Sequence, residues 1–598
     1  MKSEIQKFFK GEVEDSEKVL KKYSHDASIF EVRPKLVLYP RDSDDVRNLV
    51  EWVRDNKDKY ANPKLNEDWA GLSITARCAG TDMSGGAIGE SLILDFTRHM
   101  NKLIRRPTLK NNFLGSSGRP HEVRGAQPDQ LENHPSASAI TVQPGMFYRD
   151  FEKLTLERGL ILPCFTASKS INAMGGMFGN NSAGERTLKY GKTEDYILSA
   201  KIVFSDGNEY VVKPLNEQEL NKKILQKNFE GEVYKSIFDL INKNKEDIEH
   251  AKPKVHKNSA GYYIWNVVKN SPARKLSFDL NKLLVGSQGT LGIVTEITFK
   301  LVPNPKYSKL VAIFMQDLNS LGRLVSEILE LNPETLEAYD DKTMKLAVRF
   351  FPDFLKNKGF FGSFRLMWSF LPEFFMMLRG GFPKLILLAE FAGDNENEVH
   401  KKCIELKERI KGFQNKVHIT KSEAETNKYW DIRRESFALL RKHVQGKRTA
   451  PFIDDIIVRP EFLPKFLPEL NAILSKYDLT YTIAGHAGDG NFHIIPLMDF
   501  SHGDTTKVIL ELGELVYDLV LRYRGSITAE HNDGIIRTPY LEKMYGEKMM
   551  AIFAEVKKIF DPKNIFNPGK KIALENGSGT KEYIVSHLAV EHKVVHRV

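Results

Sequence analysis

The stretch SITARCAGTDMSGGAIGESLILDF (residues 73–96) places a glycine-rich loop between two apolar segments. SITARCAG and LILDF are predicted strands, and Gly80, Gly85, Gly86 and Gly89 lie between them. Glycines let a backbone approach a ligand closely, and successive amide N–H groups form a concavity that binds anions. The G-x-G-x-x-G spacing is absent and no βαβ unit follows, so the loop is neither a Rossmann fingerprint nor a Walker loop. Alone, it indicates either a phosphate site or an ordinary tight turn.

Two more glycine loops strengthen the phosphate interpretation. GGMFGNNSAG (residues 175–184), whose small, polar residues predict neither helix nor strand, adds the amide and hydroxyl donors of Asn180, Asn181 and Ser182. GSQGTLGIVTE (residues 286–296) begins an apolar strand that glycines interrupt. Together the three loops predict a dinucleotide held in extended form across one domain.

Composition limits the classes of protein that fit. A chain of 598 residues is too long for one hydrophobic core, so two or three domains are expected. A net charge of +9 fits a nucleic-acid binder, an anionic membrane surface or an acidic substrate, and does not choose among them. The three cysteines lie far apart, which argues against a disulfide framework and a protein-ligated iron–sulfur cluster. Without an apolar signal region or a run of about 18 apolar residues, we expect a cytoplasmic protein, bound at most to the cytoplasmic face of a membrane.

The second half of the chain has a different pattern. From Lys309 onward, apolar segments such as KLVAIFM and KLILLAEF alternate with amphipathic helical segments. This alternation predicts an α+β domain with an antiparallel sheet covered by helices. Within it, residues 350–382 are rich in phenylalanine and accompanied by basic residues. That stretch is either a helical insertion packed into the domain or an interfacial segment that places aromatic rings in lipid.

The segment AGHAGDGNFH (residues 484–493) carries His486 and His493 around a glycine-rich, acidic centre. In a straight strand this odd spacing points the two side chains to opposite faces, so we predict a turn at residues 488–491 that brings the imidazoles together. Glu530 follows in GSITAEHNDG. Two histidines and a carboxylate form a metal-ligand set with open positions for water or substrate, although glycine-flanked histidines also occur as purely structural residues.

Seven motifs follow one another along the chain: ARCAGTDMSGG, TVQPG, GGMFGNNSAG, GSQGTLGIVTE, HAGDGNFH, AEHNDG and IFNPGK. In these motifs the chain resembles flavoproteins of the vanillyl-alcohol-oxidase/PCMH type, in the branch of the D-lactate, glycolate and D-2-hydroxyglutarate dehydrogenases. The resemblance runs from about Pro34 to Lys571 and implies an α+β fold, with a bipartite PCMH-type FAD-binding domain and an antiparallel-sheet cap domain that binds substrate. It implies an FAD-binding domain at residues 32–304, a cap domain at 305–530 with an insertion at 345–384, and a C-terminal segment at 531–573 that returns to the flavin.

The resemblance also implies non-covalently bound FAD. Gly80 to Gly85 are expected to hold the pyrophosphate, and this loop has no histidine for a covalent link to the flavin. Gln288 stands where the family commonly has glutamate, a change that we expect to leave the essential contacts intact. The expected cofactor contacts are Gly80, Thr81, Asp82, Met83, Ser84, Gly85, Pro144, Gly145, Gly175, Gly176, Asn181, Ser182, Thr290, Gly292, Ile293, Val294 and Asn567.

By the same resemblance, His486, His493 and Glu530 are expected to bind a divalent metal, Zn²⁺ first, with Mn²⁺, Fe²⁺ or Co²⁺ as alternatives. Such a metal chelates a 2-hydroxy acid and lowers the pKa of its hydroxyl group. His531 is then the expected general base, or alternatively a third histidine ligand.

Arginine suits binding of the substrate carboxylate because its planar guanidinium makes two fixed hydrogen bonds. The stretch YWDIRRES matches the family's Trp-x-x-Arg pattern and nominates Arg433, with Arg434 as the neighbour expected at the surface. Arg537 is a second candidate.

Two positions separate the chain from the hydroxyglutarate enzymes that it resembles. Ile453 and Ile495 stand where those enzymes place a lysine and an asparagine. A second substrate carboxylate loses these partners, so D-lactate is expected ahead of D-2-hydroxyglutarate or glycolate, unless the pocket is built around Arg448 or Lys447.

Larger members of the family carry a C-terminal iron–sulfur domain, and this sequence stops without one. Electrons are therefore expected to leave to a quinone, a diffusible carrier or a separate iron–sulfur partner subunit, and no nucleic-acid partner is expected. Two alternatives stay open. One is an oxidase that passes electrons to O₂, and the other is a basic membrane-surface or nucleic-acid-binding protein whose glycine loops are structural.

Overall fold

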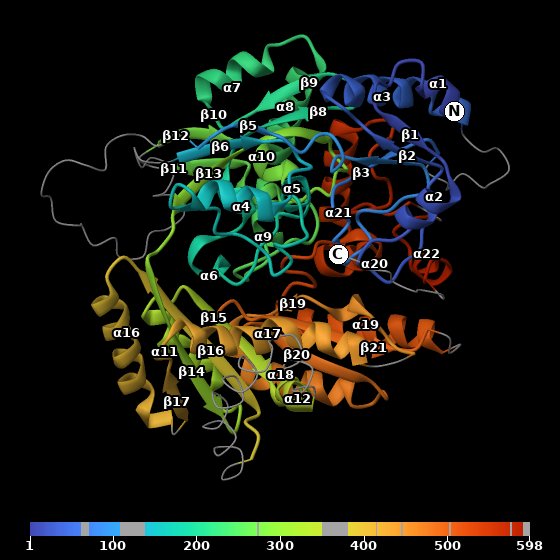
Figure 1. The fold of residues 1–598 in the computed structure, drawn as a ribbon. Helices are drawn as coiled ribbons and strands as arrows, with labels where there is room; N and C mark the ends of the chain where they lie inside the picture. Colours follow the sequence, from blue (N-terminus) through green and yellow to red (C-terminus); the bar gives the residue numbers. More distant parts are fainter. Residues whose placement is uncertain are drawn as a thin grey trace, which may run out of the picture.

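In the computed structural model the chain forms two halves, one above the other in Figure 1. The lower half runs from β14 (Tyr307–Met315) to α19 (Thr505–Arg522), and the upper half combines the N-terminal part of the chain with the red C-terminal helices. The domain boundaries expected at residues 304 and 530 stay predictions. The structure describes residues 1–60, 71–107, 138–271, 274–349, 381–413, 415–443, 446–500, 504–574 and 577–589.

A four-stranded sheet near the N-terminus carries the first glycine loop. Its order is β1-β2-β4-β3, and both β2 and β3 run parallel to β4. The two strands predicted around the loop are confirmed as β3 and β4. Adjacent parallel strands need a connection that returns along the sheet, and between β3 and β4 the glycine loop provides it. The strands are β1 (Glu12–Glu14), β2 (Leu36–Tyr39), β3 (Ile74–Arg77) and β4 (Leu92–Asp95).

A six-stranded antiparallel sheet carries the other two glycine loops. Its order is β5-β6-β13-β8-β9, and β7 pairs with β13. The helices α8 (Phe229–Lys243) and α21 (Leu541–Phe560) bury apolar residues in the same hydrophobic core. The strands are β5 (Leu103–Arg105), β6 (Ser138–Val142), β7 (Leu160–Ile161), β8 (Ile197–Val203), β9 (Glu209–Val212) and β13 (Ile293–Pro303).

The second glycine loop contains a helix that the sequence pattern does not predict. Met174–Asn180 form the short helix α5, which corrects the expectation of neither helix nor strand. Met174, Met177 and Phe178 are spaced at helical intervals and buried, and this burial stabilises the helix despite its glycines. Asn181 ends the helix in the left-handed conformation, with a φ of 50°.

The lower half is built on an eight-stranded antiparallel sheet, as the alternating pattern predicts. Its order is β17-β14-β16-β15-β20-β21-β18, and β19 pairs with β21. Helices α11 (Leu321–Glu330), α16 (Glu396–Arg409), α18 (Leu463–Leu474) and α19 share a core with one face, and α17 (Glu423–His443) covers the other face with Tyr429 and Trp430. The remaining strands are β15 (Thr335–Asp340), β16 (Leu385–Gly393), β17 (Lys416–Ile419), β18 (Arg448–Thr449), β19 (Ile456–Ile457), β20 (Thr480–His486) and β21 (Asn491–Met498).

The two predicted ligand histidines lie on the β20–β21 hairpin. His486 pairs with Asn491 and Ala484 pairs with His493, so both imidazoles lie on the same face of the sheet. The predicted turn is confirmed, one residue earlier, at residues 487–490. The turn therefore lets two histidines at an odd spacing lie on one face of the sheet.

The C-terminal segment returns to the N-terminal sheet. Phe566 forms a β-bridge with Ile74, and the Ile74 N–H donates to the Ile565 carbonyl at 2.8 Å. Phe30 and Ile88 of the upper half are buried in one hydrophobic core with residues of the eight-stranded sheet. The two halves are therefore held together by shared apolar burial.

Among the described residues, no helix combines the length and the apolar composition that crossing a membrane requires. The helix α12 (Asp341–Arg349) leads into the phenylalanine-rich stretch, of which residues 350–380 lie outside the described residues. The lipid-facing role considered for residues 350–382 stays a prediction.

Gly490, in the hairpin turn, has no room for a side chain. Its φ is +76°, and a Cβ would lie 1.8 Å from the Val458 carbonyl oxygen. We predict that Gly490→Ala lowers the stability of the protein by about 2 kcal/mol or more, because left-handed backbone alone costs an L-residue about 1–2 kcal/mol. Gly412→Ala is the matched control, since nothing lies within 4 Å of its Cβ position. The midpoint of urea denaturation measures the effect, and equal midpoints for the two variants would contradict the prediction.

Candidate active site

A cluster of histidines and carboxylates lies where the β20–β21 hairpin meets the segment that follows α19. His486 Nε2 lies 3.5 Å from His493 Nε2 and 3.1 Å from Glu530 Oε1. Ligand atoms at about 2.0–2.1 Å from one tetrahedral Zn²⁺ lie about 3.3 Å apart, so the three predicted ligands fit a single small cation. Asp455, His493, Glu530 and His531 also place one ligand atom each within 4.8 Å of one another.

Each hairpin histidine is held by a carboxylate at its other ring nitrogen. His486 Nδ1 lies 2.5 Å from Glu337 Oε1, and His493 Nδ1 lies 3.2 Å from Asp454 Oδ1. Glu337 comes from β15, the neighbour of β20, and both carboxylates are fully buried. A carboxylate at Nδ1 favours the tautomer with Nδ1–H and leaves the Nε2 lone pair for a metal. The surroundings of both histidines therefore suit metal ligands.

One further carboxylate holds the segment that carries Glu530 and His531. Asp455 Oδ2 accepts hydrogen bonds from the backbone N–H groups of Ala529, Glu530 and His531 at 2.9, 2.8 and 2.7 Å. Its Oδ1 accepts a hydrogen bond from the amide of Asn491, in the hairpin, at 3.0 Å. Asp455 therefore fixes the distance between the hairpin and this segment.

His531, the predicted base, lies beside His493. The two rings are stacked with centroids 5.1 Å apart, and His531 Nδ1 lies 2.8 Å from Asp454 Oδ2. The His531 side chain is 24% exposed, so it is more accessible than the 16% exposed His493. Burial lowers the pKa of His531, but the charges of Asp455 and Asp454 outweigh burial and raise it to about 9.

A buried lysine that the sequence does not single out lies behind Glu530. Lys257 Nζ is 2.5 Å from Glu530 Oε1 and 3.0 Å from Asp489 Oδ2, and its side chain is fully buried. Burial disfavours the ammonium, but the charges of Asp489 and Glu530 outweigh burial and raise the pKa of Lys257. Asp489 lies in the hairpin turn and also contacts His256, so the turn is bonded to the upper half of the molecule.

Arg433, nominated for the substrate carboxylate, lies at the edge of the cluster. Its Nε is 2.8 Å from Glu337 Oε2, and its side chain is 11% exposed. Glu337 also contacts His486, so this one carboxylate links Arg433 to a predicted metal ligand. Arg434 pairs with Glu185 and is 41% exposed, as expected of a surface residue.

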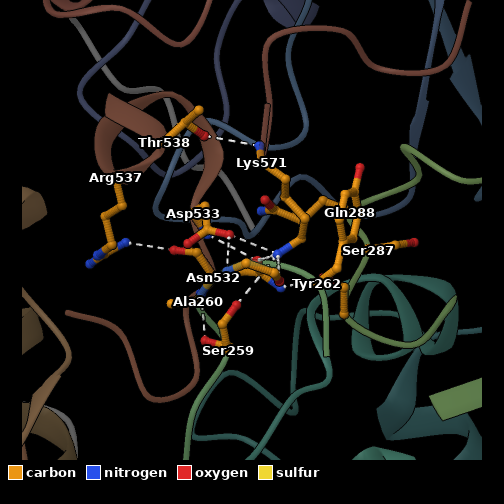
Figure 2. A network of polar contacts seen from close by, with 12 residues as sticks. Ser259, Ala260, Tyr262, Ser287, Gln288, Asn532, Asp533, Arg537, Thr538 and Lys571 are labelled. Carbon is orange, nitrogen blue, oxygen red and sulfur yellow. Dashed lines mark hydrogen bonds and ion pairs between the residues drawn. The ribbon is translucent and has the colours of Figure 1, made fainter. Parts of the chain in front are cut away.

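Arg537, the second arginine candidate, belongs to a buried network instead. It is fully buried, and its guanidinium donates to the backbone carbonyls of Asn532 and Asp454 at 3.0 and 2.7 Å. Figure 2 shows Arg537 and Lys571 reaching Asn532 and Asp533 from two sides, and Lys571 Nζ lies 2.8 Å from Asp533 Oδ2. The guanidinium therefore holds the backbone beside the cluster, and substrate binding by Arg537 stays a prediction.

The three glycine loops meet at one carboxylate in the upper half. Asp82 Oδ1, in the first loop, accepts from the N–H groups of Ser84 and Gly86 at 2.8 Å each. Its Oδ2 accepts from the amide of Asn180 in the second loop at 2.9 Å and from the amide of Gln288 in the third loop at 3.2 Å. A glutamate in place of Gln288 would set two carboxylates against each other, whereas the amide donates.

Two glycines of the second loop leave room for a ligand. No atom lies within 4 Å of a Cβ position on Gly176 or Gly179. Gly80 and Gly85 have φ values of +67° and +86°, which side chains disfavour. An open, glycine-lined surface with backbone amides fits a pyrophosphate group.

Pro144 and Asn567, two further predicted cofactor residues, contact these loops. The Gly175 N–H donates to the Pro144 carbonyl at 2.8 Å, which places the second loop against TVQPG. Asn567 is fully buried, and its amide donates to the carbonyls of Gly86 and Gln288 at 2.9 and 2.8 Å. Thr81, Met83 and Val294 are partly exposed, and the buried residues are Gly145, Asn181, Ser182, Thr290, Gly292 and Ile293.

The segment with Glu530 and His531 is bonded directly to the first and third loops. The Ser84 carbonyl accepts from the N–H groups of Ile535 and Ile536 at 2.8 and 3.2 Å. The Gly534 N–H donates to Gln288 Oε1 at 2.9 Å. The segment that carries Glu530 and His531 therefore lies beside the glycine loops.

Two family models match this chain. A model of the C-terminal domain of FAD linked oxidases matches residues 304–571, and a model of an FAD binding domain matches residues 127–213. The chain carries regions that match an FAD binding domain and the C-terminal domain of FAD linked oxidases. The FAD-binding character expected from the glycine loops is thereby confirmed.

Curated relatives of this chain act on small hydroxy acids, as their names state. The chain is 25% identical over 555 residues to D-2-hydroxyglutarate dehydrogenase of Escherichia coli, covering 92% of this chain and 49% of that protein. It is 26% identical over 561 residues to the glycolate oxidase subunit GlcD of Bacillus subtilis, and 23% identical over 556 residues to D-lactate dehydrogenase of Anaerostipes hadrus, with 92% of both chains covered in each case. The chain thus spans about half the length of the E. coli relative.

Solved structures share the fold of this chain at low sequence identity. The chain matches 4-ethylphenol oxidase from Gulosibacter chungangensis with a TM-score of 0.62 at 13% identity, covering 96% of this chain and 97% of that one. It matches p-cresol methylhydroxylase with a TM-score of 0.61 at 14% identity, covering 94% of each chain. The expected α+β fold is confirmed.

Several residues of the site were not found from the sequence. They are carboxylates and a lysine that contact the histidines or their neighbours: Glu337, Asp454, Asp455, Asp489 and Lys257. The sequence signal that could have found the carboxylates is an acidic residue within an apolar stretch, as in PFIDDIIV and TLEAYD. A carboxylate in such a stretch is buried, and buried carboxylates are almost always paired with another polar group.

We predict that Lys257→Met destabilises the protein by about 3–5 kcal/mol, because it leaves Glu530 and Asp489 buried without their cation. Lys213→Met is the matched control, since its ion pair with Glu219 is exposed to solvent. Urea denaturation of both variants measures the difference. A loss no larger than that of the control would show that the buried pair contributes little.

Proposed function

We propose that this chain oxidises a D-2-hydroxy acid to the 2-oxo acid, with FAD on the glycine loops and a divalent cation, Zn²⁺ first, on His486, His493 and Glu530. The observation that carries the proposal is the convergence of these ligand atoms at 3.1 and 3.5 Å in a cluster bonded to the first glycine loop. The relatives with D-lactate, glycolate and D-2-hydroxyglutarate in their names support this substrate class.

The proposed chemistry divides between the groups that bind here and the side chains of the chain. FAD, when bound, supplies the acceptor for the hydride on C2 of the substrate. A divalent cation, when bound, lowers the pKa of the substrate hydroxyl. Arg433 orients the substrate carboxylate from the edge of the cluster, and His531 takes the hydroxyl proton at Nε2 while Asp454 holds its Nδ1.

His531 must be neutral to act as a base. The neighbouring carboxylates raise its pKa to about 9, which favours the protonated form at neutral pH. A divalent cation on the adjacent ligands opposes this effect, because like charges repel. Metal binding and the neutral state of His531 therefore support each other in this proposal.

The pocket positions favour a monocarboxylate. Ile453 is fully buried, and Ile495 is 4% exposed on β21 of the same hairpin. An apolar lining offers no hydrogen bond to a second carboxylate, whose desolvation then goes uncompensated. We propose D-lactate as the first substrate and D-2-hydroxyglutarate or glycolate as alternatives.

The proposed electron acceptor is a quinone or a separate carrier protein, including an iron–sulfur subunit. Cys78, Cys164 and Cys403 are free and far apart in sequence, so they do not form a cluster motif. Contact with a membrane surface through the phenylalanine-rich stretch at residues 350–382 is part of this proposal. Flotation with anionic liposomes, with and without that stretch, tests it.

We predict that anaerobic addition of D-lactate bleaches the flavin absorbance of the purified yellow protein, whereas L-lactate does not. A panel of D- and L-2-hydroxy acids, including D-2-hydroxyglutarate and glycolate, ranks the substrates by rate. A colourless protein, or flavin that no 2-hydroxy acid reduces, would overturn the proposed function. Rapid reoxidation in air with release of peroxide would identify an oxidase.

We predict that His531→Ala retains bound FAD but reduces the flavin about 10²–10⁴-fold more slowly than the unmodified enzyme, because the proton acceptor is lost. His250→Ala is the matched control, since His250 is exposed on α9 (Lys245–Ala251) and bonds only within its own helix. Stopped-flow absorbance at saturating substrate measures both rates. An undiminished rate in His531→Ala would assign the base to another residue.

A further inference from the structure

We propose that Asp454 sets the tautomers of both His493 and His531, and thereby prepares the metal ligand and the base together. This inference rests on the proposed function and adds a positioning residue to it. Neither the resemblance nor the sequence pattern points to Asp454, because Ile453 is the residue of PFIDDIIV that they single out.

The geometry around Asp454 assigns one oxygen to each histidine. Oδ1 lies 3.2 Å from His493 Nδ1, and Oδ2 lies 2.8 Å from His531 Nδ1. The carboxylate is fully buried, and each of its two oxygens faces one ring nitrogen. Oδ2 and His531 Nδ1 face each other outside hydrogen-bond geometry, and neither has another hydrogen-bond partner among the described residues. A carboxylate only accepts hydrogen bonds, so an Nδ1–H on each ring satisfies both oxygens.

A neutral imidazole carries a single N–H, so this pairing decides the state of the other nitrogen. With Nδ1 protonated, Nε2 of His493 has a free lone pair for a cation, and Nε2 of His531 has a free lone pair for the substrate proton. One carboxylate thus prepares two functions in neighbouring rings, whose centroids are 5.1 Å apart.

The neighbouring carboxylates have different tasks. Glu337 holds His486 with one oxygen and Arg433 with the other. Asp455 holds the backbone of the segment that carries the base. Asp454 itself is fixed from behind, because its backbone carbonyl accepts a hydrogen bond from the buried Arg537 at 2.7 Å.

Asp454→Asn separates the two tasks. The side-chain amide has one oxygen that accepts and one NH₂ group that donates, so it can match the Nδ1–H of only one histidine. A cation on His493 forces that ring to keep Nδ1–H, which turns the amide oxygen toward His493. The NH₂ group then faces His531, whose proton has to move to Nε2, where it blocks the base.

We predict that Asp454→Asn, saturated with Zn²⁺, retains FAD but is reduced by substrate about 10²–10⁴-fold more slowly, with little change in KM. The loss falls on kcat because substrate binding does not involve Asp454. In the metal titration, its affinity for Co²⁺ falls about 10–100-fold, as for other residues that orient metal ligands. An unchanged kcat, or a loss confined to KM, would overturn the inference.

A double-mutant cycle tests whether Asp454 acts through His531. In the background of His531→Ala, adding Asp454→Asn is expected to slow flavin reduction no further, since the base is already absent. Multiplied losses would show that Asp454 contributes to the rate by another route. Asp340→Asn is the matched control, because this buried carboxylate of the same sheet accepts only from Thr343 and the Ile483 N–H.

A readout without substrate separates this inference from the proposed function. Long-range ¹H–¹⁵N spectra of the histidine-labelled holoenzyme with Zn²⁺ distinguish Nδ1–H from Nε2–H rings, and His493→Gln and His531→Ala assign the signals. Both rings are expected as Nδ1–H tautomers in the unmodified protein. An Nε2–H signal for either ring would overturn the inference even if the enzyme oxidises hydroxy acids. If both rings are Nδ1–H but no hydroxy acid reduces the protein, the proposed function is contradicted and the inference about Asp454 is not.

Discussion

The hydrogen bonds between the Ser84 carbonyl and the N–H groups of Ile535 and Ile536 are the contact on which the site depends. They join the first glycine loop to the segment that carries Glu530 and His531, although the two lie far apart in sequence. Gly534 makes this approach feasible, since a Cβ there would lie 2.3 Å from the Ser84 carbonyl oxygen. The position of the histidine cluster relative to the glycine loops is therefore set by backbone, which is more rigid than side-chain contacts.

Buried charge reinforces this contact. Lys571 and Arg537 are fully buried and hold Asp533, Asn532 and the backbone of Asp454. Buried ion pairs of this kind add little net stability compared with apolar packing, but they tolerate few alternative arrangements because each unpaired charge is costly. The network therefore fixes the positions of these residues where the two halves of the molecule meet. The shared apolar core supplies most of the free energy that holds the halves together.

The sequence was informative wherever local spacing decides the structure. The strands around the first glycine loop and the hairpin that joins His486 to His493 follow from periodicity and turn residues. The short helix α5 was missed because its glycines hide the helical spacing of Met174, Met177 and Phe178. The supporting carboxylates were missed for another reason: Glu337 reaches His486 only because β15 pairs with β20, and a single sequence does not show strand order.

The charges of the site suit the proposed binding of a cation beside the histidines. The carboxylates Glu337, Asp454, Asp455, Asp489 and Glu530 outnumber the permanent cations Lys257, Arg433 and Arg537 that contact them or lie close by. Protons on the imidazoles offset this excess when no cation is bound, and the carboxylates raise the pKa values of His486 and His531 to about 9. A divalent cation would offset the same excess while leaving the imidazoles neutral. Protons on the imidazoles and a metal ion therefore compete to neutralise the same carboxylates. In the proposed metal site, the buried carboxylates would favour a cation through the field that they create as well as through the ligand atoms that they orient.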